Sequence, residues 1–131
     1  MKGIFEAEDA IVGIACGLLL LGYAGKFFTL KLPNFVYVMA FSIFIIFILL
    51  DLINEFSDLA RHFFFVGGAI LHNIVDLVIS LTFISFFSGW NIPYITQYLV
   101  PYLQNPSIIP GLGMFLVIAN LIWLFIFPFA S

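Results

Sequence analysis

The sequence predicts an all-α integral membrane protein with four transmembrane helices and a short interfacial amphipathic helix. Hydrophobic residues make up 64% of the 131 residues and charged residues only 8%, whereas about a quarter of a soluble domain is charged. No Asp, Glu, Lys, Arg or His follows Asp76. The apolar residues also form segments of about 20 residues, the length that crosses a bilayer as a helix. The predicted location is therefore the membrane, with several passes of the chain.

The composition excludes several other classes of protein. The chain has the length of one domain, residues 1–131. Its four basic residues against seven acidic ones are too few for a nucleic-acid-binding surface. The single cysteine, Cys16, cannot form an internal disulfide or a zinc finger. No phosphate-binding glycine loop or GxSxG motif is present, and an enzyme is therefore not the expected class.

The first two predicted spans are residues 10–30 and 35–56. Within the first, Gly13 and Gly17 form a GxxxG motif, and small residues let two helices approach closely in lipid. We expect these glycines to pack against another helix, either within the chain or in a second copy. Pro33 separates the two spans because the residue before a proline resists the helical conformation.

The third and fourth predicted spans are residues 63–88 and 108–128. The turn before the third span has two candidate positions, Ser57–His62 and the glycine pair Gly67-Gly68. The earlier position is favoured because it gives two helices of ordinary length.

The stretch between the last two spans, residues 90–105, is uncharged and rich in aromatic side chains. If it is helical, a spacing of four places the following residues on one face: Trp90, Tyr94, Tyr98 and Tyr102. Such amphipathic aromatics favour the level of the lipid headgroups, and this stretch is predicted to lie on the membrane surface. A quinone or lipid-headgroup pocket that uses the tyrosines is the alternative.

A histidine and an aspartate in the third span are the main candidate functional residues. His72 and Asp76 lie four residues apart, on one face of a helix, and an ionisable group in the bilayer costs about 2.5–3.5 kcal/mol and needs a partner. The pair has three interpretations: a buried structural contact, a proton or quinol-linked relay, or half of a tetrahedral site for a divalent metal. The run from His72 to Asp76 resembles the HxxxD element of transmembrane helices in cation diffusion facilitators, a similarity that covers one helix.

A metal would need further ligands from the chain or from a second subunit. The weaker candidates recur on one face of the second predicted helix and just beyond it: Asp51, Glu55, Asp58 and His62. The same stripe is also typical of a helix that leaves the membrane with its polar side toward water.

We expect a structural or accessory subunit of a membrane complex, either a homo-oligomer or part of an energy-converting or transport assembly. The expected partners are the lipid bilayer and copies of the chain or other membrane subunits, without nucleic acid. One alternative is a small oligomeric ion or divalent-metal transporter that uses His72 and Asp76, and another is a viral envelope or capsid membrane protein. A divalent metal and a bound lipid or quinone are the only cofactors that the residues suggest.

Overall fold

The computed structural model describes residues 3–25, 27–58 and 63–130, with side chains except at 3–7, 55, 57–58, 63–67, 69 and 126–130. The described residues contain helices and no strand, which confirms the predicted all-α class. The elements are α1 (Gly3–Ala24), α2 (Asn34–Asp58), α3 (Phe63–Ser88), α4 (Ile95–Tyr98), the 3₁₀ helix η1 (Val100–Gln104) and α5 (Ile108–Ala130).

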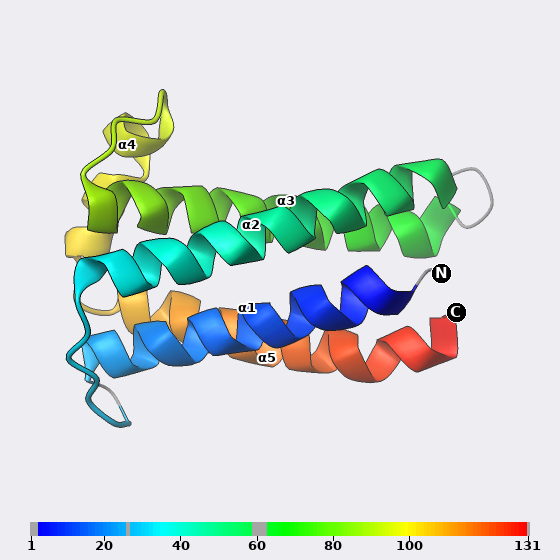
Figure 1. Ribbon diagram of the computed structural model, residues 1–131, viewed down its shortest axis with the longest axis horizontal. Coiled ribbons are helices and arrows are strands. Elements are labelled where there is room, and N and C mark those ends of the chain that lie inside the picture. Colours follow the sequence, from blue (N-terminus) through cyan, green and yellow to red (C-terminus); the bar gives the residue numbers. More distant parts are fainter. Residues whose placement is uncertain (1–2, 26, 59–62, 131) are drawn as a thin grey trace.

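The four long helices run alongside one another in alternating directions (Figure 1). One end of the bundle holds the start of α1, the end of α2, the start of α3 and the end of α5, and we call it the terminal end. The loop between α1 and α2 lies at the other end, together with α4 and η1, and we call this the loop end. The main contacts are α5 with α1, α1 with α2, and α2 with α3, whereas α3 and α5 touch only sparsely.

Two helices end at a glycine in the left-handed conformation. Gly25 (φ 69°) follows α1 and Gly89 (φ 76°) follows α3, a conformation that glycine adopts without the steric cost other residues meet. The amide of Gly89 donates a hydrogen bond to the carbonyl of Ser85. The predicted first span ran to residue 30, but the helix stops at Ala24 because Gly25 turns the chain.

Small residues allow α1 and α5 to pack closely. A Cβ atom on Gly17 would lie 2.6 Å from the carbonyl oxygen of Gly113 and 2.7 Å from Val117 Cγ2. A Cβ atom on Gly13 would lie 2.6 Å from Asn120 Nδ2. Both glycines of the GxxxG motif therefore face α5 of the same chain.

Three helices are long and apolar enough to cross a membrane, over Asn34–Asn54, Ile70–Ser88 and Ile108–Phe125. Large apolar side chains lie on their outer surfaces, among them Phe35, Met39, Ile43, Leu71, Ile118, Ile122 and Phe125. Several polar side chains are instead fully buried, including Asp51, Asn73 and Asp76. A water-soluble bundle has the opposite arrangement, and these features indicate a membrane protein.

Aromatic side chains fill the core toward the loop end. The rings of Tyr37 (α2) and Phe87 (α3) stack with centroids 4.5 Å apart, and those of Phe41 and Phe83 stack at 5.3 Å. Tyr23 of α1 meets Phe87 edge to face at 5.1 Å. Aromatic pairs of this geometry contribute about 0.5–1.5 kcal/mol each beyond the area they bury. This aromatic core joins the first three helices.

The earlier candidate position for the turn between the second and third helices, Ser57–His62, lies largely outside the described residues. Helix α2 ends at Asp58 and α3 begins at Phe63, and the turn itself lies outside the described residues. The start of α3 at Phe63 places Gly68 inside the helix.

The aromatic stretch 90–105 differs from the single helix that was expected. It forms the separate short elements α4 and η1, and Tyr94 precedes α4 with a positive φ of 66°. Proline explains the break, because Pro93 precedes α4 and Pro101 occupies the first turn of η1. Trp90, Tyr94, Tyr98 and Tyr102 are all exposed, but they belong to a loop and two short turns instead of one helical face.

Candidate functional site: a polar cluster inside the bundle

Five polar side chains of three helices lie inside the bundle toward its terminal end. We call them the polar cluster, and they are Asp51 (α2), His72, Asn73 and Asp76 (α3), and Asn120 (α5). Asp51, Asn73 and Asp76 are 0% exposed and Asn120 is 1% exposed. Burial of such groups is costly unless each finds a partner, and the contacts among them therefore decide what the cluster does.

The sequence of α3 directs its polar side chains toward two neighbouring helices. Successive residues of an α-helix point about 100° apart, and His72 and Asn73 consequently reach different partners. Asn73 Nδ2 donates a hydrogen bond to Asp51 Oδ2 of α2 at 2.8 Å. His72 Nε2 lies 3.2 Å from Asn120 Oδ1 of α5. Helix α3 is thus linked to α2 on one side and to α5 on the other.

His72 is the centre of the contact with α5. Its Nε2 atom also lies 3.3 Å from Asp76 Oδ2, one helical turn along α3. Its ring lies beside that of Trp123, with centroids 5.5 Å apart. The pair predicted from the spacing of four therefore lies in contact, and Asn120 and Trp123 join it from a helix that touches α3 little elsewhere.

The orientation of the Asn120 amide indicates which ring nitrogen of His72 carries a hydrogen. Asn120 Nδ2 donates to the carbonyl oxygen of Leu116 at 2.8 Å, which leaves Oδ1 facing the imidazole. Asn120 Oδ1, one of the two near neighbours of His72 Nε2, can only accept a hydrogen bond. A bare ring nitrogen would place its lone pair against that of this oxygen, and the contact therefore favours a hydrogen on Nε2.

We predict that the neutral ring of His72 is the Nε2–H tautomer in lipid nanodiscs. Nitrogen-15 NMR of histidine-labelled protein distinguishes the two tautomers, and the His62→Gln variant leaves His72 as the only labelled ring. Asn120→Leu removes one acceptor and should increase the population of the other tautomer. A neutral ring with its hydrogen on Nδ1 in the His62→Gln protein would contradict the contact with Asn120.

The remaining polar groups near the cluster are used locally. Ser80 donates to the carbonyl of Asp76 at 2.8 Å, and Thr82 donates to that of Val78 at 2.7 Å, the bond that hydroxyls form with the preceding turn of their own helix. Asp9 of α1 is also buried, at 3% exposure. Asp9 was not among the predicted site residues, because it lies beside other acids near the start of the chain.

The predicted metal ligands are brought together only in part. His72 and Asp76 meet, whereas Asp51 is hydrogen-bonded to Asn73. The side chains of Glu55, Asp58 and His62 lie outside the described residues. Among the side chains that are described, no three of His, Cys, Asp or Glu form a group that could hold a metal ion.

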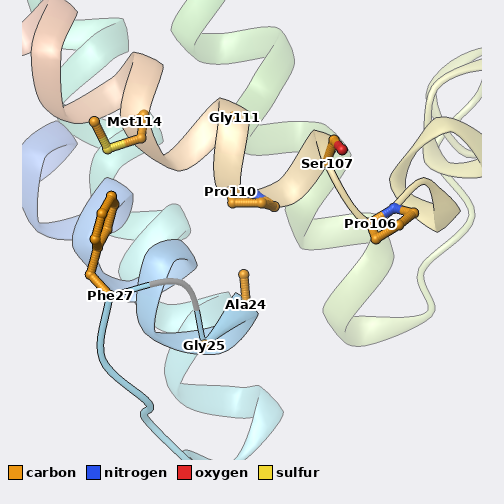
Figure 2. Close-up of a pocket in the computed structure, with 8 residues that line it drawn as sticks. All are labelled: Ala24, Gly25, Phe27, Pro106, Ser107, Pro110, Gly111 and Met114. Carbon is orange, nitrogen blue, oxygen red and sulfur yellow. The ribbon is translucent and has the colours of Figure 1, made fainter.

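Three cavities lie toward the loop end and share no residue with the polar cluster. The one in Figure 2, of about 360 Å³, lies where the end of α1 and the following loop face the start of α5. Its lining residues are Ala24, Gly25, Phe27, Pro106, Ser107, Pro110, Gly111 and Met114. A second, of about 350 Å³, lies beside Trp90, and a third, of about 170 Å³, is partly open and is lined by residues of α3, α5 and η1 and by Leu99.

No protein-family model, characterised protein or solved structure matches the chain. The class that the fold and composition define is a helical membrane protein.

Proposed function

We propose that all four long helices cross the membrane, with α1 as the fourth span. Helix α1 packs along α5 through Gly17 and Gly113 and also contacts α2, and both of those helices contain a candidate span. A helix packed between two spans over its length lies at the same depth as they do. Exposed Ile11 and Leu18 give α1 an apolar outer side as well.

Four crossings require both chain ends to lie on the same side of the membrane. We predict that epitope tags fused to the two ends are digested together, or protected together, when sealed vesicles are treated with protease. Lysed vesicles provide the control, because both tags should then be digested. Digestion of one tag alone in sealed vesicles would contradict an even number of crossings.

We further propose that the chain is an accessory, structural subunit of a membrane complex, whether of copies of itself or of an energy-converting or transport assembly. The observation that carries this proposal is the direction of the described polar contacts. Asn73 with Asp51 and His72 with Asn120 link helices of the same chain, and the outer surface of the helices is covered with large apolar side chains. Such a surface suits contact with lipid and with other membrane helices.

The second candidate is a small oligomeric ion or divalent-metal transporter, and one contact favours it. His72 and Asp76 approach within 3.3 Å inside a candidate span, where ionisable residues often mark a transport path. The aromatic core lies between this pair and the loop end, stacked across α2 and α3. A path through one chain would have to pass that core, and the oligomeric form of this proposal is therefore preferred.

Native mass spectrometry tests both proposals. The protein is released for it from nanodiscs that are made from its own membrane. We predict a complex that contains several copies or other subunits, and that the His72→Ala variant keeps the same composition. A chain recovered only as a monomer would contradict the subunit proposal. A metal mass that is present in the natural protein and lost in His72→Ala and Asp76→Ala would favour the transporter instead.

A further inference from the structure

The contact between α3 and α5 is sparse, and a cavity between them opens to the surface. The other neighbouring helices pack extensively, α5 on α1, α1 on α2 and α2 on α3. Helices α3 and α5 are instead bridged at two places along their length. Toward the terminal end His72 reaches Asn120, and toward the loop end η1 contacts both helices.

A cavity of about 170 Å³ lies beneath that second bridge. Its walls are Val78, Ile79 and Thr82 of α3, Ile108 and Leu112 of α5, and Leu99, Tyr102 and Leu103 of the connecting segment. The hydroxyl of Thr82 is already bonded to the carbonyl of Val78. Apart from Tyr102, the cavity therefore offers apolar surface. An apolar cavity of about 150 Å³ stays free of water and binds small hydrocarbons.

We propose that this cavity binds the acyl chain of a phospholipid, which enters from the bilayer between α3 and α5. Both helices contain candidate spans, and hydrocarbon is then the medium next to the opening. Val78 and Tyr102 line the cavity and are also 38% and 64% exposed, which gives an acyl chain direct access. The inference rests on the proposed membrane location and is independent of the subunit function.

The depth of the cavity fits a phospholipid. Thr82 lies six residues before the end of α3 at Ser88, which corresponds to about 9 Å along the helix. That depth matches the upper methylene groups of a lipid whose headgroup lies among the exposed rings of Trp90, Tyr98 and Tyr102. An isoprenoid quinone carries only a small uncharged ring, which is held less strongly at this level than a charged phosphate headgroup.

Val78 and Val75 provide a matched pair of substitutions. Both are about equally exposed on α3, at 38% and 37%, but only Val78 lines the cavity. Val78→Phe should fill the cavity, and Val75→Phe adds the same group one turn away. After exchange into mild detergent, native mass spectrometry with analysis of the extracted lipids should find retained phospholipid on the natural chain and on Val75→Phe, and its loss from Val78→Phe.

Equal retention in the two variants would overturn the proposal, and so would a quinone in place of the phospholipid. Circular dichroism and size-exclusion chromatography report whether Val78→Phe is folded. If it is not, Leu112→Phe fills the same cavity from α5 and decides the result in the same way. A chain that is monomeric but retains the lipid would contradict the subunit proposal and leave the lipid site supported.

Discussion

Replacing Gly17 by alanine is expected to lower the free energy of unfolding by about 1–3 kcal/mol, the usual effect of overpacking. The added Cβ atom would lie 2.6 Å from the backbone oxygen of Gly113 and 2.7 Å from Val117 Cγ2. The backbone oxygen cannot rotate away as a flexible side chain could, and α1 and α5 must therefore separate. The intrinsic gain from Gly to Ala in a helix, about 1 kcal/mol, is too small to offset this.

Gly111 supplies the matched control for this prediction. It lies in α5, it is exposed, and a Cβ atom there would meet nothing within 4 Å. Gly111→Ala should therefore raise the free energy of unfolding by up to about 1 kcal/mol through helix propensity alone. Reversible unfolding in mixed micelles, followed by circular dichroism, measures both variants. A stabilised Gly17→Ala protein would show that α1 does not pack on α5 through this face.

Replacing Asn73 by leucine is expected to cost about 3 kcal/mol of unfolding free energy. The substitution keeps the size of the side chain but removes the 2.8 Å hydrogen bond to the fully buried Asp51. Hydrogen bonds to charged groups contribute about 1.5–3 kcal/mol, and a buried acceptor left without its donor costs about 1–3 kcal/mol, or more if it is charged. The link between α2 and α3 is thus predicted to be the most sensitive of the polar contacts.

A double variant separates the hydrogen bond from the space that Asn73 fills. The double variant Asp51→Leu, Asn73→Leu leaves no carboxylate in the core at this contact. It should therefore be more stable than Asn73→Leu alone. The same substitution at the exposed Asn91 should change the stability little. If Asn73→Leu and Asn91→Leu had equal effects, Asp51 and Asn73 would not form the contact described.

Most of the helices could be predicted from the sequence because their signals are local. Long apolar runs define the interiors of α2, α3 and α5, and Pro33 and the Gly89 turn mark where helices begin or end. The end of α1 was placed too late because Phe27, Phe28 and Leu30 continue the apolar pattern beyond Gly25. The left-handed conformation of Gly25 decided that boundary, and the apolar pattern of the sequence does not specify the conformation of a glycine.

The candidate site could be predicted only where its partners lie on the same helix. His72 and Asp76 are four residues apart, and helix geometry alone brings them together. Asn120 and Trp123 reach His72 from 48 and 51 positions further along the chain, and Asp51 meets Asn73 across a turn between helices. Those contacts depend on how α3 is rotated against α2 and α5, which no local pattern specifies.

The start of α1 and the finish of α5 at one end of the bundle have a practical and an evolutionary consequence. With an even number of crossings, a soluble domain fused to either extremity would be delivered to the same compartment. Two copies joined head to tail would keep a common direction with only a short connector between them. A duplicated gene for this chain could therefore yield a parallel tandem without any additional helix to reverse its orientation.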